Sequence, residues 1–164
     1  MNRFAISLCA LLSLAPLSAR AADTIDKISR ADMMSLLKDL GMTDIKDDTT
    51  DEQWPSIQFA TPGGYVEVVS FFDCQTGVTG PARTCDELLF QTNWNNTKNL
   101  DAAALNPYNV QKVFGRAGVS ADGKNVSIDW GMDLDGGVTR ENLMRNINYY
   151  QRTVSDFSTM VKPN

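Results

Sequence analysis

The sequence predicts an α+β domain, in which an antiparallel sheet is packed by an N-terminal helix and a long C-terminal helix. Three observations lead to this fold class. Apolar residues recur at helical spacing near both ends of the domain, and β-branched or aromatic runs lie between them. One of these runs alternates between apolar and polar residues, as a strand with one buried face does. The order helix, strands, short helix, strands, long helix is that of a sheet covered by helices on one side.

The first predicted helix covers residues 29–40 and follows a loose lead over residues 22–27. Ser29 is expected to be its N-cap, and Asp32 adds negative charge to the first turn. Gly41 stands where a helix commonly ends in the left-handed conformation. We expect the apolar face of this helix to pack in the core. That face consists of Met33, Leu36, Leu37 and Leu40.

Two strands are predicted next, after a polar stretch. Residues 43–53 are rich in acids and predict a solvated loop with at most a short edge strand. The strand expected over residues 54–59 lies at a sheet edge or has Pro55 at its start, because proline has no N–H to donate. A tight turn at residues 61–64 leads into the run YVEVVSFF over residues 65–72. Its apolar side chains on both faces predict a central buried strand.

Two cysteines frame a loop at residues 73–84, which precedes a returning strand over residues 86–91. Cys74 and Cys85 are the cysteines that remain once Cys9 leaves with a predicted signal peptide. In an exported chain such a pair predicts a disulfide, here across the mouth of a hairpin. A redox dithiol or a metal-binding pair is the alternative, although the spacing is not C-x-x-C and the chain has no histidine.

The second half of the domain is predicted to hold a short helix over residues 101–105, a strand over residues 110–119 and a turn at residues 121–124. The clearest strand in the chain follows over residues 125–134. We expect the apolar residues of its alternation to face the core. These are Val126, Ile128, Trp130, Met132 and Leu134.

A long amphipathic helix is predicted to close the domain. Gly136 and Gly137 end the preceding strand, Thr139 is expected to be the N-cap, and the helix runs to about residue 161. We expect its apolar stripe to cover the sheet of the same chain. The stripe consists of Leu143, Ile147, Tyr150, Val154, Phe157 and Val161.

The N-terminal residues predict export. Arg3 gives a positive start, residues 4–17 are mostly apolar, and small residues mark a cleavage site between Ala21 and Ala22. The apolar run of 14 residues is shorter than the ~20 residues that span a bilayer. A cleaved signal peptide therefore explains this segment better than a membrane anchor.

We accordingly predict a signal peptide over residues 1–21, a single domain over residues 22–164, and a periplasmic or secreted location in a bacterium. The signal peptide holds two of the 15 basic residues and none of the 20 acidic ones, so the mature chain has a net charge of −7. That balance gives no electrostatic reason to bind nucleic acid or anionic lipid. No later apolar stretch reaches 18 residues, so we expect no membrane span after signal cleavage.

The sequence offers little catalytic chemistry. The chain has no histidine, and no hydrolase, phosphate-loop or dinucleotide-binding motif is present. Asp129 and Asp133 share a strand face but lie ~13 Å apart, beyond the ~5–9.5 Å of paired glycosidase carboxylates. Asp133 and Asp135, ~7 Å apart, would qualify only if the strand continued through Asp135. We predict no catalytic residues and no cofactor.

The segment from Asp133 to Gly136 has part of the pattern of an EF-hand calcium loop. If Gly136 is the sixth loop position, the first is Gly131 and the twelfth is Asn142, so two of the strongest ligands are missing. A strand end that turns through two glycines explains these residues better. We predict no metal site.

Several segments resemble the YbjN family, in the branch that carries a signal peptide. They are FFDCQ and CDELLFQT around the cysteines, LNPYNVQK, and MDLDGGVTRENL at the start of the last helix. The resemblance covers roughly residues 30–161, and Tyr108 stands where the family usually has tryptophan. It implies a type III secretion chaperone-like fold, which often forms homodimers. It also implies the label of a sensory transduction regulator, without a defined mechanism.

The leading hypothesis is an exported, non-catalytic YbjN-like binding or interaction module with a chaperone-like or regulatory role. Its contact surface would be the first helix or the exposed face of the sheet, and its partner an unidentified protein or peptide. A second copy of the chain, forming a homodimer, is a further candidate partner. The alternative is a cell-envelope enzyme that uses carboxylates. An exposed apolar groove would favour the module, and a cleft with converging acids would favour the enzyme.

Overall fold

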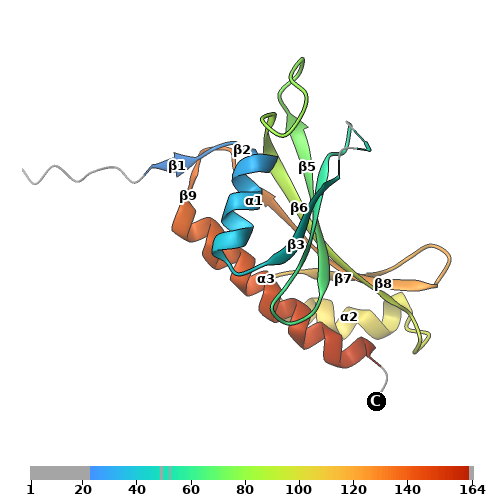
Figure 1. Cartoon of the computed structure of the whole chain (residues 1–164). Helices are drawn as coiled ribbons and strands as arrows, with labels where there is room; N and C mark the ends of the chain where they lie inside the picture. The colour runs from blue at the N-terminus through green and yellow to red at the C-terminus, as the bar shows by residue number, and fades with distance from the viewer. Residues whose placement is uncertain (1–22, 49, 52, 163–164) are drawn as a thin grey trace, which may run out of the picture.

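The computed structural model describes residues 23–48, 50–51 and 53–162 (Figure 1). The predicted signal peptide and its cleavage site between Ala21 and Ala22 lie outside these residues. The described part of the chain is an α+β domain with one large antiparallel sheet and helices on one side of it, so the predicted fold class is confirmed.

Within the described residues, seven strands form the large sheet in the order β3-β4-β5-β6-β8-β7, with β2 paired to β6 beside that path. A separate two-stranded sheet joins β1 to β9. The central position belongs to the long strands β5, β6 and β8, which supply most of the buried strand residues. The strands are β1 (Thr24–Ile25), β2 (Ile28–Ser29), β3 (Thr43–Asp48), β4 (Ser56–Ala60), β5 (Val66–Cys74), β6 (Thr84–Asn95), β7 (Arg116–Val119), β8 (Asn125–Asp133) and β9 (Val138–Thr139).

The long helix α3 (Arg140–Val161) lies along the inner face of the sheet (Figure 1). Its N-cap is Thr139, as predicted, and the Thr139 side chain accepts a hydrogen bond from the N–H of Asn142. All residues of the predicted apolar stripe are buried. Among them, the Tyr150 ring lies against Phe90 of β6, with ring centroids 5.8 Å apart. The core therefore sits between α3 and the central strands.

The two shorter helices lie on the same side of the sheet. In α1 (Arg30–Asp39) the N-cap is Ser29, and the predicted apolar face joins the common core. The helix α2 (Ala102–Gln111) lies beside α3, because the Tyr108 ring contacts Phe157 at 4.9 Å and its hydroxyl donates to the Thr153 carbonyl. No helix of the described residues covers the opposite face of the sheet (Figure 1), and none is long and apolar enough to cross a bilayer.

The loose lead predicted over residues 22–27 is wrong for the residues that the structure describes. Ile25 of β1 pairs with Val138 of β9, and Ile28 of β2 pairs with Cys85 of β6. These strands are two residues long, so their side chains show no alternation that a pattern search can detect. They form because the fold brings β9 next to β1 and β6 next to β2, so that their backbones can pair.

The strand predicted over residues 110–119 is also largely wrong. The helix α2 continues to Gln111, and β7 begins only at Arg116. The β-branched Val110 and Val113 suggested a strand, yet their side chains are 78% and 89% exposed. Packing of Leu105 and Tyr108 against the core outweighs the local preference and keeps this segment helical.

Candidate functional site

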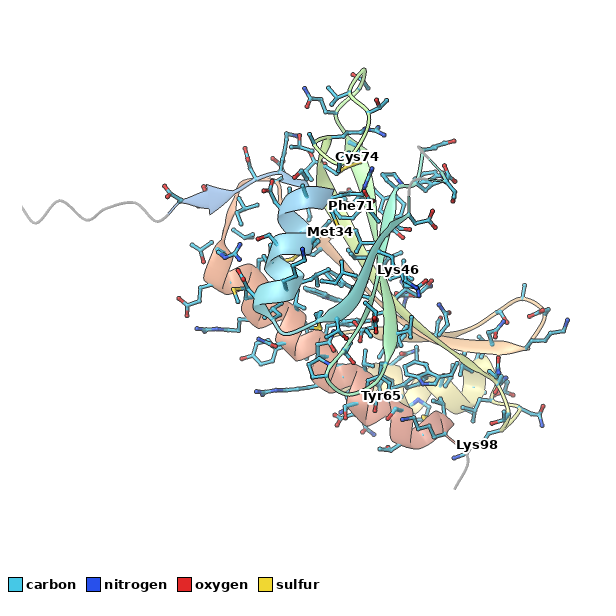
Figure 2. The ribbon with its side chains drawn as sticks, viewed as in Figure 1. Met34, Lys46, Tyr65, Phe71, Cys74 and Lys98 are labelled. Atoms are coloured by element: carbon cyan, nitrogen blue, oxygen red, sulfur yellow. A yellow bond between two sulfur atoms is a disulfide. The ribbon has the colours of Figure 1, made fainter. Side chains whose placement is uncertain are left out.

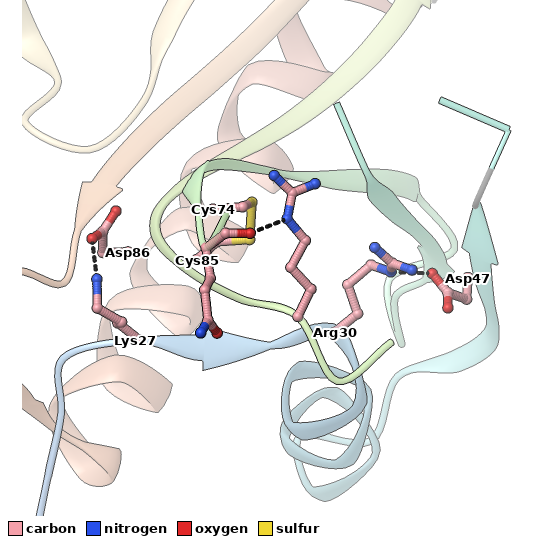
Figure 3. The surroundings of a disulfide bond; sticks show 8 residues. Lys27, Arg30, Asp47, Cys74, Cys85 and Asp86 are labelled. Carbon is pink, nitrogen blue, oxygen red and sulfur yellow. Dashed lines mark hydrogen bonds and ion pairs between the residues drawn. A yellow bond between two sulfur atoms is a disulfide. The ribbon is translucent and has the colours of Figure 1, made fainter. Parts of the chain in front are cut away.

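The predicted cysteine pair lies at the end of the hairpin formed by β5 and β6. The structure contains a Cys74–Cys85 disulfide between residues that are register partners in these strands. Cys85 is almost fully buried and also pairs with Ile28 of β2. Figure 3 shows the ion pair between Lys27 and Asp86 beside the disulfide, with 2.7 Å between the charged atoms. The disulfide thus lies where three strands meet.

The acids considered for catalysis take part in other interactions or lie outside the strand. Asp129 forms an ion pair with Arg116, with 3.1 Å between the charged atoms. The strand β8 ends at Asp133, so Asp135 lies in the following turn, where its N–H donates to the Asp133 side chain. The condition for pairing these two carboxylates is therefore not met. Among the described residues, no group of three His, Cys, Asp or Glu side chains is placed to hold a metal ion.

The two edge strands of the large sheet are poor templates for an added strand. At β7, the Asn109 side chain donates to the Ala117 carbonyl and accepts from the Ala117 N–H, at 3.0 and 2.7 Å. It occupies the hydrogen-bonding groups that a neighbouring strand would use. At β3, the pairing shifts register between Thr43 and Lys46, and Asp44 has a φ of 49°. Irregular and charged edges resist strand addition, so the faces of the sheet are the better candidates for binding.

The uncovered face of the sheet carries an apolar strip along β5. We call it the open-face strip. The Trp54 ring packs against Phe72, with centroids 5.1 Å apart, and is 49% exposed. A hollow of about 440 Å³ adjoins Phe72 and Leu89, where Gly131 of β8 leaves space. The open-face strip consists of Trp54, Val66, Val68, Phe72 and Leu89.

A larger groove lies on the other side of the molecule, between α3, the end of α1 and the turn from β4 to β5. Its volume is about 970 Å³, at the upper end of the range for ligand sites. The turn is fixed by two hydrogen bonds, in which the Thr61 N–H donates to the Tyr65 carbonyl and the Gly64 N–H donates to the Thr61 carbonyl. Figure 2 shows Tyr65 at this turn beside α3, where its hydroxyl is hydrogen-bonded to Ser158.

A buried carboxyl lies next to this groove, and no sequence motif pointed to it. Glu67 is on the inner face of β5 and is 0% exposed. Its Oε2 accepts a hydrogen bond from the Gln151 amide at 2.6 Å, while its Oε1 has no hydrogen-bond partner among the described residues. Burial raises the pKa of Glu67 to about 8, against the weaker opposite effect of the hydrogen bond from Gln151. The only available signal was one acid in an apolar run, in step with the buried Val69 and Phe71.

Comparison with known proteins agrees with this fold. A family model named YbjN, described as "Putative bacterial sensory transduction regulator", matches residues 29–163. Among solved structures, the "Crystal structure of YbjN, a putative transcription regulator from E. coli" is similar with a TM-score of 0.56 and 15% sequence identity. The similarity covers 81% of this chain and 90% of that chain, and at this identity it concerns the fold. The search of curated proteins found no match. Because the family model spans most of its length, this chain belongs to the YbjN family.

Proposed function

We propose that the protein is an exported, non-catalytic interaction module that binds a protein partner through the open face of its sheet. The observation that carries this proposal is the open-face strip, which lies on a face that no described helix covers. Contiguous exposed apolar side chains commonly mark protein interaction sites. The partner chemistry that fits is an apolar protein surface or segment laid across β5 and β6.

The sheet face has more support than the first helix as the contact surface. The apolar side of α1 packs in the core of the domain, where Met33, Leu36 and Leu37 are fully buried. The outward side presents polar residues, among them Ser35 and Lys38. Of the two surfaces considered from the sequence, the sheet face has exposed large apolar residues, Trp54 and Val66, whereas those of α1 are buried or half-buried.

A regulatory role has more support than catalysis. The YbjN family model is described as "Putative bacterial sensory transduction regulator", and the similar E. coli structure as that of "a putative transcription regulator". Asp129 is held in an ion pair, and Asp135 lies beyond the end of β8. The side chain of Glu67, whose pKa is raised, is fully buried. The alternative of a carboxylate enzyme therefore has no site that would support it in the described residues.

Export is part of the proposal and has two supports. One is the predicted signal peptide at residues 1–21. The other is the disulfide, because such bonds form and persist in oxidising compartments such as the periplasm. We accordingly place the mature protein in the periplasm or outside the cell.

The test is capture of partners by the tagged mature protein from periplasm, followed by mass spectrometry. The test variant is Val68→Lys with Leu89→Lys, which puts two charges on the open-face strip. The control is Val110→Lys, which introduces a lysine at an exposed valine of α2, outside the hollows next to Leu89. We expect specific partners to be captured by the native protein and the control and lost by the test variant. Equal capture by both variants would contradict the proposal.

A second copy of the chain is one protein partner that the same surface can accept. Light scattering across a hundredfold concentration range separates this case from a different partner. A dimer that the Val68→Lys, Leu89→Lys variant abolishes would identify the second copy as the occupant. A mass that stays at one chain would leave a different protein as the partner.

A further inference from the structure

The groove between α1 and α3 has an apolar wall and a charged rim, which together define a ligand class. Its lining residues come from α3, the segment at the end of α1 and the 61–65 turn, and none of them belongs to the open-face strip. A ligand in this groove would therefore not require the proposed protein partner.

The inner wall of the groove is apolar and adaptable. Met42 and Met144 both line the groove, and thioether side chains adjust their shape to a ligand at little cost. Tyr65 also lines it and is held in place by its hydrogen bond to Ser158, with 2.8 Å between the oxygens. Leu40 and Pro62 complete the apolar lining. A wall of this kind suits the hydrocarbon part of a small molecule.

The rim of the groove is basic. Arg145 and Arg152 of α3 both line it, and the single acid in the lining, Glu141, is paired with Arg145 at 2.7 Å. Arg152 lies over the Tyr149 ring and has no carboxylate within ion-pair distance among the described residues. The ammonium of Lys162 adds further positive charge, 4.6 Å from the centre of the Tyr65 ring. The rim is thus positive, although the whole chain has a formal net charge of −5.

A buried carboxyl lies behind one of the polar residues that line the groove. Gln151 lines the groove and donates its amide N–H to Glu67, which is buried and keeps one oxygen without a partner. Because burial holds Glu67 protonated at neutral pH, it does not offset the charge of the arginines.

We propose that this groove binds a small amphipathic organic anion, such as a medium-chain carboxylate. Its apolar body would lie against Met42, Met144 and Tyr65. Its anionic end would lie between Arg145 and Arg152, because guanidinium groups form charge-assisted hydrogen bonds with carboxylates. The groove is thereby a second binding site of the protein, suited to a small molecule.

The test uses octanoate as the probe, with isothermal titration calorimetry and ¹⁵N NMR on the purified mature protein. Octylammonium has the same chain with opposite charge, and acetate has the same charge without the apolar body. We expect octanoate to bind more tightly than either, with shifts at the amides of the 61–65 turn and the facing part of α3. The same preference with shifts confined to β5 and β6 would overturn the proposal, as would no octanoate binding at about 10 mM, the level of a very weak ligand.

Variants test whether the arginines and the apolar wall of the groove contribute to octanoate binding. Arg145→Gln with Arg152→Gln should weaken octanoate binding about tenfold or more, and both side chains are exposed enough for the fold to persist, which a melting curve checks. Met144→Ser should weaken it as well, while Lys124→Gln, at an exposed lysine on a distant turn, should leave it unchanged. Equal binding by the double arginine variant and the native protein would refute the assignment. None of these measurements requires a protein partner, so they can fail while the open-face proposal stands.

Discussion

Replacing Glu67 by glutamine tests how the buried carboxyl controls stability. The native side chain is fully buried on β5 and receives one hydrogen bond, from Gln151. Glutamine has nearly the same shape, keeps an oxygen that can accept this hydrogen bond, and cannot ionise. The substitution therefore removes the titration and leaves most of the packing intact.

The magnitude follows from the two pKa values. The pKa of Glu67 is about 8 in the folded protein, against 4.5 for an exposed glutamate, because burial disfavours the charged form. A raised folded pKa means that stability is fully present below about pH 4.5 and is lost as the pH rises to about 8. At about 1.36 kcal/mol per pKa unit, the free energy of unfolding of the native protein should fall by about 4 kcal/mol between pH 5 and pH 9 from this group alone.

Urea unfolding followed by tryptophan fluorescence measures this effect across the same pH range. We expect Glu67→Gln to equal or slightly trail the native protein at pH 5 and to exceed it by several kcal/mol at pH 9. Glu87→Gln is the matched control, since Glu87 is exposed on the neighbouring strand β6, and it should follow the native profile. If the difference in unfolding free energy between Glu67→Gln and the native protein does not change with pH, the argument from burial is wrong.

Three further predictions follow from other features. Alkylation and mass spectrometry of unreduced periplasmic protein should find no free thiol at Cys74 or Cys85, and replacing both by serine should lower stability by about 2–4 kcal/mol with the fold retained; two alkylated cysteines would contradict this. Asn109→Ala should cost about 1–3 kcal/mol because it leaves the backbone N–H and carbonyl of Ala117 without their side-chain partners; an unchanged rate of hydrogen exchange at the Ala117 amide would argue against it. The melting temperature should not respond to EDTA or millimolar calcium, whereas a rise of several degrees with calcium would contradict the expectation that the chain has no metal site.

The elements that could be predicted from the sequence are those whose side chains repeat over many residues. The last helix has six apolar positions at helical spacing, and the structure buries all of them in α3. The strand β8 alternates over its whole length and lies within one residue of its predicted bounds. Long amphipathic patterns are informative because a single face of the element is buried.

The elements that could not be predicted depend on contacts between distant segments. The strands β1 and β2 are only two residues long and exist through pairing with β9 and β6. The helix α2 extends beyond the residues predicted to be helical because Tyr108 contacts α3 through its ring and its hydroxyl.

The groove and the open-face strip could not be predicted for the same reason, because both depend on how distant segments pack together. The groove brings together Met42, Tyr65 and Met144, which are far apart in the chain. The open-face strip depends on which side of β5 the helices cover. Neither the spacing nor the composition of the sequence contains that information.

The pairing of β1 with β9 has a consequence for the order in which the chain can fold. A chain that crosses a membrane with its N-terminus first presents Thr24 and Ile25 before any of their partners. Their pairing residues, Val138 and Thr139, emerge only after the whole sheet has been delivered, and Thr139 is also the residue that starts α3. The strand β1 therefore cannot pair until β9 is present, and contacts of such long sequence separation form slowly. If the chain is exported as proposed, the β1–β9 pair therefore closes only after all strands of the large sheet have crossed.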